Sequence, residues 1–135
     1  MRGIMADNNI QGQVDILVYL LESETWRELW NHLELIVYTF DDLGLLPGDP
    51  DAVVWDSCQR NEIVLITNNR NDDGPDSLET TLRTRNTATS LPVLTLADAE
   101  HVRNSGAYAT RVVERLIDIL LEIDNYRGTG RLYLP

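Results

Sequence analysis

A short apolar run near the middle of the chain constrains the fold most strongly. The run from Ile63 to Thr67 is rich in β-branched residues and ends abruptly in a polar loop from Asn68 to Asp76. A continuous apolar run bounded by turn residues predicts a strand buried on both faces, as in a parallel sheet covered by helices. The open crevice of such a sheet lies at the carboxyl ends of its strands. The polar loop is therefore the predicted functional edge.

Strand and helix patterns alternate along the rest of the chain. β-branched and apolar runs predict three further strands, at Gly3 to Ala6, Leu35 to Thr39 and Leu91 to Thr95. Helical spacing of apolar residues predicts helices at Gln11 to Leu21, Asp51 to Asn61 and Tyr108 to Ile123. Helix-start signals predict helices at Thr25 to His32 and Leu78 to Arg85, and we expect a short helix at Leu96 to Arg103. This order predicts an α/β protein, a three-layer α/β/α sandwich around a short, mainly parallel central sheet. The helix before the central strand indicates a right-handed βαβ unit.

Three helix starts carry recognisable signals. Thr25 and Asp76 each open a segment of capping-box form, and the sequence Asp49-Pro50-Asp51 combines a capping acid with a proline suited to the first helical position. We therefore expect helices to begin at these three places.

The length of 135 residues suits one domain, which we assign to residues 1–125. The helix from Tyr108 to Ile123 has a wide apolar face, so it is either buried on more than one side or part of a subunit contact. Residues 126–135 are glycine-rich and then apolar, which predicts an extended arm that packs on the body or on a partner. A homodimer is one expectation from these two features.

Charge and cysteine content limit the function. The net charge of -11 disfavours nonspecific binding to duplex DNA, because an acidic surface repels polyanions. All positive charge comes from arginine, whose planar fork still allows a local site for phosphate, although arginines on a surface commonly only pair with nearby acids. Cys58 is the only cysteine and sits in an apolar pattern, which predicts a buried structural thiol. With no signal sequence or bilayer-spanning run, we expect a cytoplasmic protein without a membrane partner.

Polar residues at strand ends form the candidate site. Asp7 follows the first strand, Asp51 opens a helix, and the loop after Thr67 contains several asparagines and aspartates. Carboxylates brought together repel one another unless a cation lies between them. Carboxylate, amide and water oxygens suit Mg²⁺ or Mn²⁺, ions that activate water and stabilise a phosphodiester transition state.

This order of elements and acids resembles the PIN-like nuclease domains over roughly the first two thirds of the chain. The resemblance implies a small α/β/α fold in which a few acids at the strand ends hold a divalent metal and cleave RNA, often as the toxin of a toxin–antitoxin pair. It also implies single-stranded RNA as substrate and a protein inhibitor as partner.

Only some of the functional positions of the PIN-like family have a matching residue in this chain. The first-strand aspartate of the family corresponds to Asp7, followed here by Asn8 where an acid is common. The helix-opening aspartate corresponds to Asp51, with Asp49 as the competing choice. After the central strand the family pattern has threonine and two alternating aspartates, whereas this chain has asparagine at both acidic positions, which lowers the expected affinity for Mg²⁺. The predicted catalytic residues are Asp7, Asp51, Asn69 and Asp72, the metal ligands Asp7, Asp51 and Asp72, and the substrate-binding residues Asn68 and Arg70.

Structural roles compete with each of these assignments. Asp51 is equally suited to complement the helix dipole, and the asparagines after Thr67 are suited to making a turn. Arg70 either binds an anion or neutralises Asp7 and Asp72. Two functions therefore remain open: a metal-dependent PIN-like ribonuclease, or a PIN-like domain that has lost catalysis and acts as an interaction or regulatory module.

Overall fold

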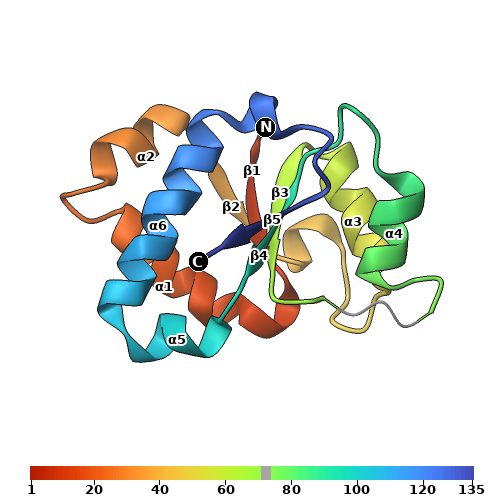
Figure 1. Ribbon diagram of the computed structural model, residues 1–135, viewed down its shortest axis with the longest axis horizontal. Helices are drawn as coiled ribbons and strands as arrows, with labels where there is room; N and C mark the ends of the chain where they lie inside the picture. The colour runs from red at the N-terminus through yellow and green to blue at the C-terminus, as the bar shows by residue number, and fades with distance from the viewer. Residues whose placement is uncertain (71–73) are drawn as a thin grey trace.

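The protein is described by a computed structural model over residues 1–70 and 74–135, so Asn71, Asp72 and Asp73 lie outside the described residues. Its centre is one five-stranded sheet in the order β2-β1-β3-β4-β5, and every neighbouring pair of strands is parallel (Figure 1). The strands are β1 (Gly3–Ala6), β2 (Ile36–Tyr38), β3 (Ile63–Thr67), β4 (Val93–Leu96) and β5 (Arg131–Leu134). The predicted α/β/α sandwich is confirmed.

Helices cover both faces of the sheet (Figure 1). One layer, the α1–α6 face, is formed by α1 (Gln11–Leu21), α2 (Arg27–Leu33), α5 (Ala99–Asn104) and α6 (Gly106–Leu121). The other, the α3–α4 face, is formed by α3 (Asp51–Arg60) and α4 (Leu78–Arg85). Short 3₁₀ turns add Asn8–Ile10, Asp41–Leu43 and Ile123–Tyr126.

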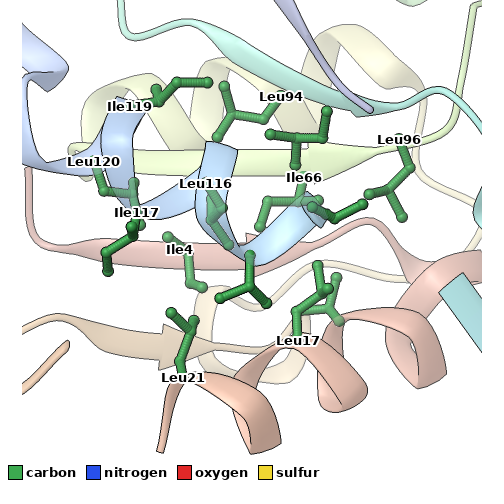
Figure 2. Packing of buried hydrophobic residues seen from close by; sticks show 14 of the residues in the cluster. Ile4, Leu17, Leu21, Ile66, Leu94, Leu96, Leu116, Ile117, Ile119 and Leu120 are labelled. Carbon is green, nitrogen blue, oxygen red and sulfur yellow. The ribbon is translucent and has the colours of Figure 1, made fainter. Parts of the chain in front are cut away.

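Alternation along the strands divides the core between the two faces. Because successive strand residues point to opposite sides, Ile4 and Ile66 pack with α1 and α6, whereas Met5 and Leu65 pack with α3. Figure 2 shows Ile4, Ile66 and Leu94 facing the α6 side chains, with Leu17 and Leu21 of α1 beside them. All five residues of β3 are buried, as the continuous apolar run predicted.

The wide apolar face of α6 is explained by two contacts within the chain. Leu116 and Leu120 are almost fully buried and belong to the cluster that α6 shares with the sheet and with α1 (Figure 2). Burial on more than one side is therefore what the structure shows for this helix. Leu121, at the end of α6, remains partly exposed.

The connections between strands do not all have the same hand. The chain crosses the α1–α6 face from β1 to β2, then runs the other way across the sheet over the α3–α4 face, from β2 to β3 and from β3 to β4. These three connections share one hand, and the right-handed unit predicted around α3 is among them. From β4 to β5 the direction across the sheet is unchanged, but α5 and α6 lie on the α1–α6 face. The last connection is therefore left-handed, an uncommon arrangement.

The C-terminal segment belongs to the sheet. Residues Arg131–Leu134 pair in parallel with β4, in the register Val93 with Arg131 and Leu96 with Leu134. Of the two placements left open for the predicted arm, packing on the body is the one observed. The division between residues 1–125 and 126–135 therefore does not separate the tail from the folded unit.

Helix starts match the sequence signals in one place and depart from them in two. The helix α4 begins at Leu78 as expected, but its cap is Ser77 and not Asp76: the Ser77 Oγ accepts a hydrogen bond from the Thr80 amide at 3.2 Å. The predicted capping at Thr25 is wrong, because α2 begins at Arg27, its N-cap residue is Trp26, and no side chain in the described part of the chain caps it. At α3 the N-cap residue is Pro50, which cannot cap through its side chain.

Candidate functional site

The candidate site lies where the sheet reverses its strand order. The chain leaves β1 toward one edge of the sheet and leaves β3 toward the other, so the two connections diverge from the carboxyl ends of these adjacent strands. A crevice forms at such a switch point in open α/β sheets. Here it is a cavity of about 340 Å³, lined by Asp7, Asn8, Asn9, Pro47, Asp51, Asn68 and Asn69.

Asp7 is held at the end of β1 by two hydrogen bonds. Its Oδ1 accepts the Asn8 amide at 2.8 Å, and its Oδ2 accepts the hydroxyl of Thr67 at 2.8 Å. The Asp7 amide in turn donates to the Ile66 carbonyl at 2.8 Å, which continues the β1–β3 ladder into the site. The carboxylate is therefore fixed relative to the end of β3.

Asp51 reaches the same cavity from the first residue of α3. Its Oδ2 accepts the side-chain amide of Asn69 at 2.9 Å and the backbone amide of Leu78 at 3.0 Å. Asp51 lines the cavity, and its Oδ1 accepts no hydrogen bond from the described residues. Asp49, the competing choice, instead accepts the Leu46 amide at 2.8 Å in the preceding turn. Asp51 thus has a role beyond the dipole of its own helix.

Asn69 connects the two carboxylates. Its backbone amide donates to Thr67 Oγ1 at 3.0 Å, and the same hydroxyl donates to Asp7. Its side-chain Nδ2 donates to Asp51, because a carboxylate can only accept. Asn69 therefore lies between the two aspartates and bonds directly to one of them, while its catalytic role stays a prediction. Asn68 lines the cavity beside it.

Arg70 points away from the two aspartates. Its guanidinium donates to the Ala97 carbonyl at 3.0 Å, beyond the end of β4, and lies 5.8 Å from the ring centroid of Tyr133 on β5. The expectation that Arg70 neutralises Asp7 is not met within the described residues, where Asp7 is bonded to Thr67 and Asn8. Its relation to Asp72 lies outside them. Arg70 and the half-exposed Tyr133 form a cationic and aromatic rim on the β5 side of the acidic cavity, whose lining residues include neither of them.

The negative charge of Asp7 affects the pKa of a thiol in the core beneath the site. Burial raises the pKa of the Cys58 thiol to about 12, and the Asp7 carboxylate adds to this shift. Cys58 lies on α3, fully buried in the cluster that contains Met5 and Leu65. A thiol in this environment stays protonated and inert, so the predicted structural role is confirmed.

The donor set of the cavity fits a hard divalent cation. Mg²⁺ is usually held by one or two carboxylates and keeps several waters, and the cavity is lined by the carboxylates Asp7 and Asp51 and by asparagines. The described residues contain no group of three or more His, Cys, Asp or Glu side chains that could hold a metal. Of the three predicted ligands, Asp7 and Asp51 therefore share the cavity, while Asp72 lies outside the described residues.

Sequence reasoning missed two residues that support the site. One is Thr67, for which a hydroxyl as the last residue of a buried central strand is a usable sequence signal. The other is Arg131, which lies in the predicted arm. Its guanidinium donates to the Asn69 carbonyl at 2.7 Å, across 62 positions of sequence, and no local pattern indicates this contact.

Fold and site together define an all-parallel α/β/α domain with an acidic cavity at its topological switch point. Comparisons with protein-family models, with curated proteins and with solved structures find no match to the chain. None of the helices in residues 1–70 and 74–135 combines the length and the apolar character needed to cross a membrane.

Proposed function

We propose that the cavity between β1 and β3 binds Mg²⁺ or Mn²⁺ and that the protein cleaves single-stranded RNA, as the PIN-like nucleases do. One observation carries the proposal: Asp7 and Asp51, 44 positions apart in sequence, line one cavity at the switch point of a parallel sheet. The resemblance to PIN-like domains supplies the substrate class.

The two carboxylates would hold the cation, and their neighbours would keep them in place. Thr67 fixes Asp7 and Asn69 fixes Asp51, so little rearrangement is needed when a cation binds. The bound cation supplies an activated water and offsets the charge of the phosphate in the transition state. This compensation matters in a protein of net charge -11, whose acidic cavity would otherwise repel a phosphodiester.

The rim formed by Arg70 and Tyr133 is where the rest of the RNA strand would bind. Aromatic side chains stack on unpaired bases, and arginine adds contacts to phosphate. Tyr133 lies on β5, three strand spacings from β1, which is about 14 Å at ~4.8 Å per spacing. A single nucleotide does not span this distance, so the site favours an oligonucleotide over a mononucleotide.

Calorimetric titration of Mn²⁺ into the purified protein tests the cation site. We expect binding to wild type and its loss in Asp7→Asn and in Asp51→Asn. Asp118→Asn is the matched control, because Asp118 is exposed on α6 and does not line the cavity. Cleavage of a labelled single-stranded RNA should follow the same pattern, and cleavage that persists in both cavity variants would refute the assignment.

A second candidate function is an interaction module without catalysis. It is favoured by Asn69, which stands where the family pattern has an acid and donates a hydrogen bond to Asp51. In that case neither Mn²⁺ binding nor RNA cleavage is expected, and the protein would act through a protein partner, an antitoxin-like inhibitor or a second copy of itself.

Sedimentation equilibrium tests the homodimer. Leu121 on α6 and Tyr133 on β5 are the exposed apolar side chains of the two elements expected at a dimer contact. A dimer that dissociates in Tyr133→Ser or Leu121→Ser would support the interaction role. A monomer at all concentrations would remove the homodimer from this second candidate.

A further inference from the structure

We infer that Arg131 of the C-terminal strand is a positioning residue for the carboxylate site, acting through Asn69. The inference rests on the proposed function for its relevance to catalysis. Its structural basis is independent of that proposal, because it consists of contacts that link β5 to the cavity.

Arg131 is a cation buried between three elements. Its side chain is only 9% exposed, and it lies on the α3–α4 face of β5. One nitrogen, Nη1, donates to the Thr95 hydroxyl on β4 at 2.6 Å and to the Asn69 carbonyl at 2.7 Å. The other, Nη2, pairs with the Glu79 carboxylate on α4. A buried charge persists only when it is paired and hydrogen-bonded in this way.

These contacts leave Asn69 held on three sides. Arg131 fixes its carbonyl, Thr67 accepts its backbone amide, and Asp51 accepts its side-chain amide. The position of Asn69 therefore sets the spacing between Asp51 and Asp7, since Thr67 also donates to Asp7. Glu79 extends the same network to α4, whose first residue, Leu78, donates its amide to Asp51.

The left-handed connection between β4 and β5 makes this arrangement possible. By running α5 and α6 over the α1–α6 face, the chain returns to the sheet at β5 and leaves the α3–α4 side of β5 free for Arg131. The last strand thereby contributes to a site whose other members come from the first two thirds of the chain. A protein lacking β5 would keep both aspartates and lose the group that orients them.

Arg131→Lys is the test variant, because lysine keeps the positive charge for Glu79 but lacks the planar fork that reaches Asn69 and Thr95 together. Supporting residues of this kind typically change metal affinity by about 10- to 100-fold. We expect Mn²⁺ affinity to fall at least about tenfold in this variant. Arg127→Gln is the matched control, because Arg127 anchors the same tail to Glu62 and does not contact Asn69.

If Arg131 acts through Asn69, the effect of Arg131→Lys on Mn²⁺ affinity should depend on the Asn69 side chain. In an Asn69→Ala background, Arg131→Lys should lower Mn²⁺ affinity less than about twofold further, because alanine keeps the backbone carbonyl that Arg131 contacts but lacks the side-chain amide that holds Asp51. Fully additive effects of the two changes, or an equal loss in Arg127→Gln, would overturn the inference and leave Arg131 as a general stabiliser of the tail.

Amide hydrogen exchange measured without metal separates this inference from the proposed function. We expect faster exchange at the Asn69 and Leu78 amides in Arg131→Lys, with unchanged exchange in the α1–α6 layer. If wild type binds no Mn²⁺ but this local pattern appears, the proposed function fails and the positioning role stands. Equal exchange in wild type and variant at both amides refutes the positioning role.

Discussion

Replacing Thr67 by valine should weaken both the fold and the site. The Thr67 side chain is fully buried and makes two hydrogen bonds, one to the Asp7 carboxylate at 2.8 Å and one from the Asn69 amide at 3.0 Å. Valine has nearly the same shape as threonine but can make neither of these hydrogen bonds.

The magnitude follows from these two bonds. A hydrogen bond to a charged group contributes ~1.5–3 kcal/mol and a neutral one ~1 kcal/mol. The lower end applies to Asp7, whose partly exposed carboxylate regains water, and the added methyl group returns ~0.8 kcal/mol by burial. The expected loss is about 2 kcal/mol, which at an m-value of about 2 kcal/mol per molar lowers the urea midpoint by roughly 1 M.

Urea unfolding followed by circular dichroism measures this loss, and calorimetry measures Mn²⁺ binding. Thr67→Ser is the control, because serine keeps the hydroxyl and loses only one methyl group, a cost of about 1 kcal/mol. We expect the valine variant to be less stable than the serine variant and to bind Mn²⁺ about tenfold more weakly than wild type. A valine variant at least as stable as the serine variant would refute the role assigned to the hydroxyl.

Three further predictions concern regions outside the cavity. Gly3→Ala should lower the free energy of unfolding in urea by about 2 kcal/mol or more, because a Cβ would lie 2.0 Å from a carbonyl oxygen of β2. Gly48→Ala is the control: a Cβ there has nothing within 4 Å, so the change should stay within about 0.5 kcal/mol. Equal effects of the two substitutions would contradict this packing. Cys58, whose pKa is raised to about 12 by burial, should resist thiol reagents at pH 8 until urea unfolds the protein, and rapid labelling of the native state would contradict its burial. The hydrogen bond from Arg127 holds the pKa of Glu62 below its ordinary value of 4.5, so this carboxylate stabilises the fold above that value and loses its contribution as the pH falls through the lowered pKa. The stability difference between pH 7 and pH 3 should therefore be smaller in Arg127→Gln, and an unchanged difference in urea unfolding would argue against this pair.

The local sequence pattern was sufficient to predict the helices and strands near the site. The β-branched run at β3, the helix-start signal of α4 and the polar residues directly after β1 can all be recognised within a few positions of sequence. The carboxyl-edge location of Asp7 and Asp51 followed from these elements and from the general geometry of parallel sheets. The shared cavity of these two residues agrees with that expectation.

Contacts between segments that are distant in sequence could not be predicted from local sequence patterns. The bond between Thr67 and Asp7 spans 60 positions, and the bond between Arg131 and Asn69 spans 62. Nothing near Arg131 in sequence distinguishes it from the other arginines of an acidic protein. Its partners become visible only when β5 is placed beside β4 and α4 above them.

The sequence by itself determined the class of the fold, the buried central strand and the edge at which polar groups collect. Tertiary structure alone decided that the C-terminal segment is a strand, that its connection is left-handed, and that Arg70 turns toward Tyr133 while Arg131 turns toward Asn69. The physical reason is the range of the interactions. Hydrophobic periodicity and turn preferences act over a few residues, whereas strand pairing and buried ion pairs depend on which segments the whole chain brings together.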